Sequence, residues 1–498
     1  MIRSCATAVI AAMVAAPSAV LAQFPVRNFD LFAAPAAMAR REAARAELGV
    51  QIRTAIARTK NAGTWGVMVV SLTGKDTLFG TNADRLLLPA STMKLYTAAL
   101  ALEHFGPNGR FETQLSRTGT LRTDGTLDGD LVLRGAGDPT LGGPAPRNDG
   151  PSPIARLARS VADAGITQVN GALVGDATGF ADGKVPDGWR RRYLHASYAA
   201  RVSALSFNEN QIMVLVHPEA GKAAVHFRPA VSGIDVVNTV RVVAGSRGAR
   251  IQVLQDSAIG RIRITGWIGA MSRERDYKLV VENPELFALG ALRSALIAEG
   301  IKVNGPMRVG ASNEAATLVT TLASPPMTEL VAEMNGESNN HFAELLFRNV
   351  GRMYGDGGTA EASNSLLRDF LQAKAQVERE AVFAADGSGL STLDRVTPRS
   401  MVHLLDYAKQ ASWGTVLENS LPVAGKTETL ARRMRRTIAA GNLRAKTGTT
   451  NDVTSLGGYV TAANGEELAF ALIYNGRSRW IARDAIDKIG VTLAGFSR

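Results

Sequence analysis

The sequence of 498 residues contains a single cysteine, Cys5, which lies among the first 22 residues. A chain without that segment has no thiol, which excludes disulfide bonds, thiolate catalysis and cysteine-ligated metal sites. None of the six histidines is followed by another four residues later, and no His-Glu-x-x-His motif is present, so a zinc peptidase is not expected. We expect no metal, no cofactor, and surface or packing roles for the histidines.

Long apolar runs are also lacking, apart from one at the N-terminus. Arg3 precedes an apolar run over residues 6–16, and Val20 and Ala22 occupy the small-residue positions before a cleavage site. This pattern is typical of a secretory signal peptide over residues 1–22, cleaved near Ala22. An uncleaved anchor is the alternative, but the run is short for spanning a bilayer. We expect an exported, periplasmic protein with no stable membrane anchor.

The excess of basic residues is spread along the chain. Lysine and arginine number 56 against 45 acidic residues, a net charge of +11, yet only "ARRMRR" at 431–436 forms a cluster. A solvated surface explains one short cluster better than a nucleic-acid site does. We expect no nucleic-acid partner, and a positive field that favours anionic wall polymers.

The sequence pattern predicts an α+β fold with an antiparallel sheet flanked by helices. We expect the catalytic domain to be discontinuous, over residues 23–104 and 326–498, with a β-rich insert of one or two modules at 105–325. The predicted helices lie at 32–60, 89–104, 283–300, 326–335 and 340–355, and a last one follows "GRSRW". The predicted strands of the catalytic domain lie at 64–72, 76–80, 442–449, 454–462 and 467–475.

The apolar stretch "PASTMKLYTAAL" (89–100) carries one lysine, Lys94, three positions after Ser91. Residues three apart on a helix share a face. A serine hydroxyl needs a base to become a nucleophile, and a desolvated lysine can be that base because burial disfavours its ammonium form. Alone, the Ser-x-x-Lys pattern is weak, since lysines in apolar helices often reach the surface.

Two further short motifs follow in the chain. In "GESNNHFAELL", Ser338 and Asn340 lie between two predicted helices, although such residues also cap helices routinely. In "LRAKTGTTND", Lys446, Thr447 and Gly448 lie on a predicted strand, where Gly448 would let a ligand backbone approach and the strand edge could pair with an extended peptide. The alternative for this segment is a strand that ends in a polar turn.

The order Ser-x-x-Lys, Ser-x-Asn, Lys-Thr-Gly is a catalytic pattern of penicillin-binding proteins and serine β-lactamases. The chain further resembles the D-alanyl-D-alanine carboxypeptidase/endopeptidase family, the low-molecular-mass class C penicillin-binding proteins, from about residue 50 to 475. The resemblance rests on "LPASTMKL", "GDLVLRGAGDPTL", "SALSFNEN", "AADGSGLS", "LPVAGKTETL" and "LRAKTGT". The chain departs from the family at Asn339, where many members have aspartate.

The resemblance implies a role for each motif residue. Ser91 would be the acylated nucleophile and Lys94 its base, while Ser338 and Lys446 would carry a proton to the leaving amine. The substrate would be held by Asn340, Thr447, Gly448 and Thr449, with the backbone N–H groups of Ser91 and Thr449 as the oxyanion hole. Peptidoglycan peptides and β-lactam antibiotics are the implied partners.

Two other functions stay open from the sequence. A serine β-lactamase uses the same chemistry, but the 247 positions between Ser91 and Ser338 (338 − 91) exceed what it needs. A catalytically silent wall-binding protein could keep the fold, although the intact motif residues argue against it. The Asp138 turn of "GAGDPTL" is assigned a structural role.

Overall fold

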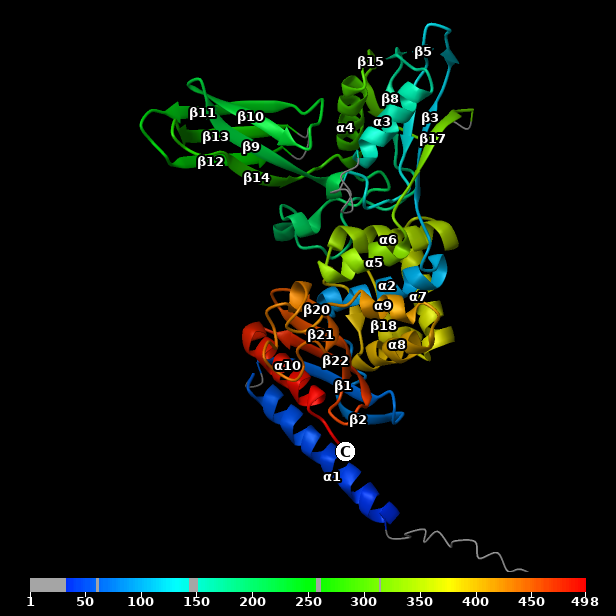
Figure 1. Cartoon of the computed structure of the whole chain (residues 1–498), viewed down its shortest axis with the longest axis vertical. Helices are drawn as coiled ribbons and strands as arrows, with labels where there is room; N and C mark the ends of the chain where they lie inside the picture. Colours follow the sequence, from blue (N-terminus) through cyan, green and yellow to red (C-terminus); the bar gives the residue numbers. More distant parts are fainter. Residues whose placement is uncertain (1–32, 60–61, 143–150, 257–260, 313–314) are drawn as a thin grey trace, which may run out of the picture. The chain divides into compact units, whose positions relative to one another are not determined.

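The computed structural model describes residues 33–59, 62–142, 151–256, 261–312 and 315–498 (Figure 1). The chain divides into two compact units, Met1–Ala43 and Ala44–Arg498, and the contacts below belong to the second. The signal peptide predicted at residues 1–22 lies outside the described residues. Helix α1 spans Ala33–Ala57, close to the predicted helix. Among the described helices, none is both long and apolar enough to cross a bilayer.

The predicted hairpin and the predicted C-terminal strands join in one five-stranded antiparallel sheet, in the order β2-β1-β22-β21-β20. The central strands are buried on both faces, and their side chains alternate between two cores, as the two-residue period of a strand requires. Ala469, Ala471 and Ile473 enter one core, whereas Leu468, Phe470 and Leu472 enter the other. The strands are β1 (Gly63–Ser71), β2 (Asp76–Thr81), β20 (Arg444–Thr449), β21 (Val453–Thr461) and β22 (Glu467–Gly476).

Helices cover the two faces of this sheet (Figure 1). Helix α10 (Arg479–Ala494) packs on β21 and β22 and belongs to the second core, while α2 and α8 contribute to the first. The predicted helix after Pro89 is a 3-10 turn, Ala90–Thr92, continued by α2 (Met93–Phe105), in which every residue from Met93 to Leu102 is buried. The helices around it are α5 (Met327–Gly336), α6 (Asn340–Tyr354), α7 (Ala360–Ala375), α8 (Pro398–Gln410) and α9 (Gly414–Asn419).

The burial of Met93 to Leu102 explains the composition of α2. Each fully buried leucine side chain contributes about 1.5–3 kcal/mol relative to an exposed one, so an apolar residue at nearly every position is stabilising here. Lys94 is the exception, and it is fully buried with them.

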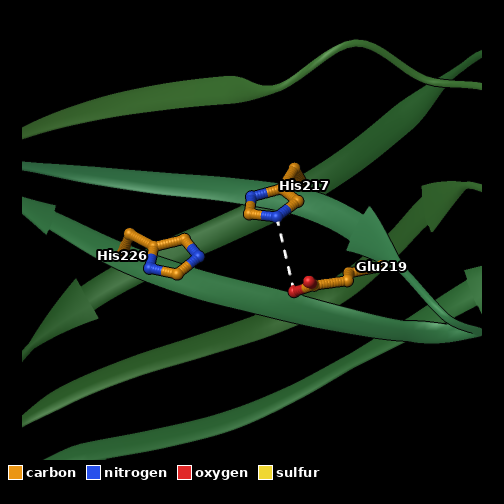
Figure 2. Close-up of side chains that lie close together, drawn as sticks. All are labelled: His217, Glu219 and His226. Atoms are coloured by element: carbon orange, nitrogen blue, oxygen red, sulfur yellow. Dashed lines mark ion pairs between the residues drawn. The ribbon is translucent and has the colours of Figure 1, made fainter.

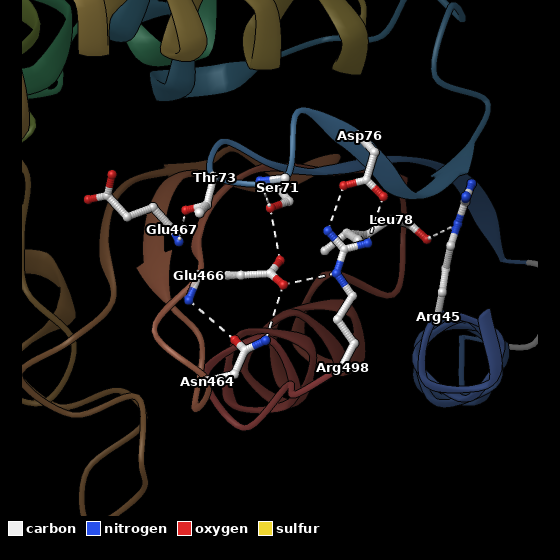
Figure 3. A network of polar contacts seen from close by, with 10 residues as sticks. Arg45, Ser71, Thr73, Asp76, Leu78, Asn464, Glu466, Glu467 and Arg498 are labelled. Atoms are coloured by element: carbon white, nitrogen blue, oxygen red, sulfur yellow. Dashed lines mark hydrogen bonds and ion pairs between the residues drawn. The ribbon is translucent and has the colours of Figure 1, made fainter. Parts of the chain in front are cut away.

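The C-terminal residue, Arg498, fastens the first hairpin to the last strands (Figure 3). Its guanidinium donates to both oxygens of Asp76 at 2.6 Å and to Glu466 at 2.9 Å. Glu466 also accepts a hydrogen bond from Ser71 Oγ at 2.8 Å. Since bidentate arginine–carboxylate pairs fix geometry in two directions, these contacts hold β1 and the β21–β22 turn in register.

The middle of the chain, predicted as β-rich with one helix at 283–300, folds into a mixed α/β region that contains this helix and a further one. One sheet has the order β16-β8-β6-β3-β17 and a second has the order β15-β7-β5-β4. Helices α3 (Pro153–Asp163) and α4 (Pro284–Ala298) share an apolar core with them. The strands are β3 (Glu112–Arg117), β4 (Thr120–Leu121), β5 (Thr126–Asp128), β6 (Leu131–Arg134), β7 (Gln168–Val169), β8 (Leu173–Asp176), β15 (Lys302–Val303), β16 (Met307–Val309) and β17 (Thr317–Ala323).

Six further strands form two three-stranded sheets, ordered β10-β9-β14 and β11-β13-β12. Val214 and Val216 of one sheet share a core with Ile262, Ile264 and Ile268 of the other. The strands are β9 (Gln211–Glu219), β10 (Lys222–Arg228), β11 (Val236–Val243), β12 (Ala249–Gln255), β13 (Ile262–Gly269) and β14 (Arg275–Val280), and a separate short pair is formed by β18 (Val382–Phe383) and β19 (Arg395–Val396).

Candidate active site

Ser91 lies in the 3-10 turn that leads into α2, and Lys94 lies on the first turn of that helix. The turn is tied to the sheet, because the carbonyl of Pro89 accepts hydrogen bonds from Thr92 Oγ1 at 2.7 Å and from Ser455 Oγ of β21 at 2.6 Å. This anchoring holds Ser91 at the edge of the sheet, with Lys94 behind it.

The ammonium nitrogen of Lys94 has three oxygen partners. It lies 3.2 Å from Ser91 Oγ, 2.6 Å from Asn340 Oδ1 and 2.8 Å from the carbonyl oxygen of Ser388. A neutral amine has two N–H donors and one lone pair. With the donors on the two shortest contacts, the amide of Asn340 and the carbonyl of Ser388, the lone pair is left for the hydroxyl of Ser91.

The surroundings of Lys94 favour that neutral form. Burial lowers its pKa from 10.5 to about 8, while the carboxylates of Asp386, Glu344 and Asp394 partly raise it. A base with a pKa near the working pH combines availability with proton affinity. The serine and lysine predicted to act together are therefore in contact, in an environment suited to proton transfer.

Ser338 lies in the connection between α5 and α6, and Asn340 is the first residue of α6. Ser338 has a positive φ of 58°, a conformation that non-glycine residues seldom adopt and that often marks a functional site. The capping role falls to Asn339, whose side chain accepts a hydrogen bond from Phe342 N. Since asparagine and aspartate cap helices equally well, the departure from the family at Asn339 preserves this function.

Asn340 is held in one orientation. Its Nδ2 donates to the carbonyl of Tyr198 at 2.8 Å, so that Oδ1 faces Lys94. Each end of the amide has capacity for one more hydrogen bond, which leaves it able to contact a substrate peptide.

Lys446 on β20 brings the third motif to the same place. Its Nζ donates to Ser338 Oγ at 2.8 Å and to the carbonyl of Thr447 at 3.0 Å. The side chain is fully buried, and burial, assisted by the nearby charge of Lys94, lowers its pKa well below 10.5. Lys446 is thus suited to exchanging a proton with the hydroxyl of Ser338.

Gly448 is required by the chain's own packing. A Cβ atom there would lie 2.2 Å from Ser455 Oγ, 2.8 Å from the carbonyl oxygen of Pro89 and 3.1 Å from the backbone nitrogen of Ser91. From the sequence, this glycine is expected to let a ligand backbone approach. The structure shows that it allows β20 to pass directly beside Ser91.

A cavity of about 320 Å³ opens at this place. Four of the predicted residues line it, namely Ser91, Ser338, Asn340 and Thr449. Lys94, Lys446 and Gly448 lie behind this lining. Thr447 does not line the cavity, and its hydroxyl donates instead to Thr429 Oγ1 at 3.2 Å. The cavity is completed by Tyr193, Tyr198, Gly389, Leu390, Thr450, Asn451 and Arg479.

Beneath Lys94 lies a group of buried carboxylates that the sequence analysis missed. Asp386 accepts hydrogen bonds from Trp189 Nε1 and from the backbone N–H groups of residues 388, 389 and 391. Glu344 accepts from Ser388 N at 2.9 Å, which orients the carbonyl that Lys94 contacts. Burial, together with the charge of Asp386, raises the pKa of Glu344 to about 8 and that of Asp394 well above its usual value.

The segment from Trp189 to Tyr198, in the middle of the chain, reaches over the cavity. Arg190 forms a 3.0 Å ion pair with Asp452, which follows β20. Tyr193 and Tyr198 line the cavity. Their sequence signal was a basic and aromatic run, "GWRRRYLHASY", which is no more specific than a surface loop.

The sequence matches the D-Ala-D-Ala carboxypeptidase 3 (S13) family over residues 50–495. It is 32% identical over 449 residues to a D-alanyl-D-alanine carboxypeptidase of an Actinomadura species, covering 87% of this chain and 81% of that one. It is also 28% identical over 405 residues to a D-alanyl-D-alanine carboxypeptidase of Haemophilus influenzae, covering 80% and 82% of the two chains.

Among solved structures, penicillin binding protein 4 of Haemophilus influenzae superimposes with a TM-score of 0.74 at 24% identity, covering 89% of this chain and 98% of that one. The same protein complexed with a β-lactam superimposes with a TM-score of 0.69. The likeness shows a shared fold and confirms the predicted α+β architecture of the penicillin-binding-protein type.

Proposed function

Because the chain belongs to the D-Ala-D-Ala carboxypeptidase 3 (S13) family, we propose that its cavity cuts the bond between the last two D-alanine residues of peptidoglycan stem peptides. Membership makes the chain a hydrolase of the serine peptidase class, with carboxypeptidases among its relatives. The observation that carries the assignment is the convergence of two lysine–serine pairs, Ser91 with Lys94 and Ser338 with Lys446, at one cavity.

In the proposed acylation step, Ser91 Oγ attacks the carbonyl carbon of the penultimate D-alanine while its proton passes to neutral Lys94. The hydrogen bonds from Lys94 to Asn340 and Ser388 support this role, because they direct its lone pair at Ser91. The negative oxygen of the tetrahedral intermediate would be bound by the backbone N–H groups of Ser91 and Thr449. The close passage of β20 beside Ser91 N, which Gly448 permits, supports this oxyanion hole.

The intermediate collapses when its C–N bond breaks and the terminal D-alanine leaves as an amine. The amine takes a proton from Ser338, which regains one from Lys446 2.8 Å away. Water then attacks the acyl-enzyme and gives a proton through Ser338 back to Lys446. The ester bond to Ser91 breaks, Lys94 returns its proton to Ser91 Oγ, and the shortened peptide is released.

The substrate would lie along β20 as an added strand. β20 is the last strand of its sheet, and its first half is covered by the backbone of residues 422–423. The segment from Lys446 to Thr449 is the part left at the edge, so an extended stem peptide could pair with it by β-augmentation. Thr447 would contribute through its backbone, because its side chain is turned toward Thr429.

A β-lactam would acylate Ser91 in the same way, because its strained amide occupies the place of the D-Ala-D-Ala bond. We assign cross-link endopeptidase activity to the same site, since both reactions cut after a D-alanyl carbonyl. Family membership favours carboxypeptidase activity over the serine β-lactamase alternative, and the assembled site argues against a silent wall-binding protein.

Export to the periplasm after cleavage near Ala22 is part of the same proposal, supported by the N-terminal sequence pattern and by the wall chemistry of the substrate. We also propose that residues 105–325 are an insert of two modules in a catalytic domain formed by 23–104 and 326–498. The separate apolar cores of the middle region support this division.

The test is release of D-alanine from a pentapeptide ending in D-Ala-D-Ala. The parent chain should release one D-alanine per peptide, and Ser91→Ala should release none. As a matched control, Ser312→Ala changes a serine that does not line the cavity and should retain parental activity. A parent chain without D-alanine release at any pH from 6 to 9 would contradict the proposal.

A further inference from the structure

Two histidines and a glutamate lie close together on strands β9 and β10, among residues that do not line the catalytic cavity (Figure 2). His217 lies on β9, Glu219 ends the same strand, and His226 lies on the neighbouring β10. Glu274 directly precedes β14, the third strand of the sheet. Nine positions separate the two histidines, so only the antiparallel pairing of β9 with β10 brings them together.

The donor atoms of His217, Glu219 and His226 lie within 4.8 Å of one another, the one such group of three that the described residues contain. His217 Nε2 is 3.6 Å from Glu219 Oε2. The two imidazole rings lie side by side, with centroids 5.0 Å apart and planes 10° from parallel. Two ligands of one tetrahedral zinc, each bound at about 2.0–2.2 Å, are separated by roughly 3.3–3.6 Å. His217 Nε2 and Glu219 Oε2 already have this spacing.

The second nitrogen of His217 has its own carboxylate. His217 Nδ1 is buried and without a hydrogen-bond partner within the described part of the chain, and Glu274 Oε2 lies 3.7 Å from it. Histidines that bind zinc usually donate their other N–H to a carboxylate, which fixes the ring and strengthens the ligand. Glu274 is placed for that role when Nε2 binds the metal.

We propose that His217, His226 and Glu219 bind one zinc ion, and that Glu274 accepts the hydrogen bond from His217 Nδ1. The ligand set of two imidazoles and one carboxylate suits zinc and disfavours magnesium and calcium, which require oxygen ligands. Glu219 and His226 are exposed, so rotation of their side chains closes the set and water fills the fourth position. The ion cross-links β9 and β10 and, through Glu274, holds the start of β14.

This site is distinct from the peptidase chemistry, and the proposal does not depend on the proposed function. Surface or packing roles were expected for the histidines because no two of them have helical i, i+4 spacing. The pairing of β9 with β10 brings two histidines nine positions apart close together, and helical spacing does not reveal such a pair. Zinc bound here would make the sheet more rigid and would not contact Ser91.

The test uses the full chain without an affinity tag, treated with chelator and dialysed. Calorimetric titration with zinc chloride should show one saturable site per chain, and titration with magnesium or calcium chloride should show none. His217→Gln and His226→Gln should each weaken zinc binding by more than about 10-fold, and Glu274→Gln by about 10–100-fold, the range found for partners of metal ligands. His403→Gln, a histidine on α8, should bind zinc like the parent.

Hydrogen–deuterium exchange should slow on zinc addition within residues 211–228 of the parent and of His403→Gln, and should not slow in His226→Gln. Acylation by penicillin should be equal in all variants, which shows that they are folded. X-ray absorption at the zinc edge of the parent should show imidazole ligands, a measurement that needs no variant. A parent chain without a saturable zinc site, or His217→Gln and His226→Gln variants that bind zinc like the parent, would overturn the proposal.

Discussion

The protonation of Lys94 should govern the pH dependence of acylation. In the proposed mechanism the neutral amine is the base, and burial lowers its pKa from 10.5 to about 8. The neutral fraction is then about 1% at pH 6, about 10% at pH 7 and about 90% at pH 9. The second-order rate constant for acylation by a fluorescent penicillin, measured by stopped flow, should therefore rise about tenfold per pH unit below pH 7 and level off above pH 9.

The magnitude follows from the same shift. With an unshifted pKa of 10.5, only about 0.03% of the amine would be neutral at pH 7, so burial increases the available base by about 300-fold. At pH 9 the buried amine is about 90% neutral and an unshifted amine would be about 3% neutral, so the advantage falls to about 30-fold. A rate constant that is flat from pH 6 to 9, or one with its midpoint above pH 10, would refute the reasoning.

A variant of the buried carboxylates tests the cause of the shift. The charge of Glu344 raises the pKa of Lys94 in part. Glu344→Gln keeps an oxygen for the hydrogen bond from Ser388 N and removes the charge that Glu344 carries near and above its own pKa of about 8, so the midpoint of the pH profile should move to lower pH. Glu329→Gln, on the exposed side of α5, is the matched control and should leave the midpoint in place. Equal midpoints in parent and Glu344→Gln would show that this carboxylate does not act on Lys94.

Three further perturbations test other parts of the account. Ser338→Gly relieves the positive φ and removes the hydroxyl next to Lys446, so D-alanine release should fall by about 100–10,000-fold; a fall below threefold would exclude Ser338 from proton transfer. Gly448→Ala places a Cβ 2.2 Å from Ser455 Oγ, so penicillin acylation should slow about 100-fold, and unchanged kinetics would mean that β20 is not held against Ser91. Burial raises the pKa of Asp138 to about 6, so the free energy of unfolding falls as this carboxyl ionises between about pH 4 and 6. Asp138→Asn keeps an acceptor for Thr140 and removes the buried charge, so it should increase the free energy of unfolding by about 2–3 kcal/mol at pH 7.5 and by little at pH 4. Equal gains at both pH values would contradict this.

That the three motifs come together could be predicted from the sequence, because their residues are close along the chain or occur in a fixed order that a known family shares. Ser91 and Lys94 lie three residues apart, and an apolar helix predicts burial around them. Lys94 also contacts Asn340, which is 246 positions away. This contact could be predicted only from the family resemblance, because the order of the motifs alone does not bring the two residues together. The terminal strands were also predicted, because alternating and apolar runs mark β1, β21 and β22.

Other parts of the site depend on tertiary contacts that leave no pattern in the sequence. Glu344 occupies an ordinary helical position of α6. Only its packing against residues 386–391 buries it and places its carboxyl group near Lys94. Thr447 has the spacing of a substrate-binding residue, yet strand alternation turns its side chain toward Thr429. Helices α7 and α8 were not predicted, although both have capping threonines at their first turns.

The central claim is that Ser91 is the residue acylated when the two lysine–serine pairs converge. Its most direct test is intact-mass spectrometry of the purified chain incubated with benzylpenicillin, followed by mapping of the modified peptide. The account predicts one penicilloyl group per chain, on the peptide containing Ser91, and none on Ser91→Ala. An adduct on any other residue, or an equal adduct on Ser91→Ala, would contradict it.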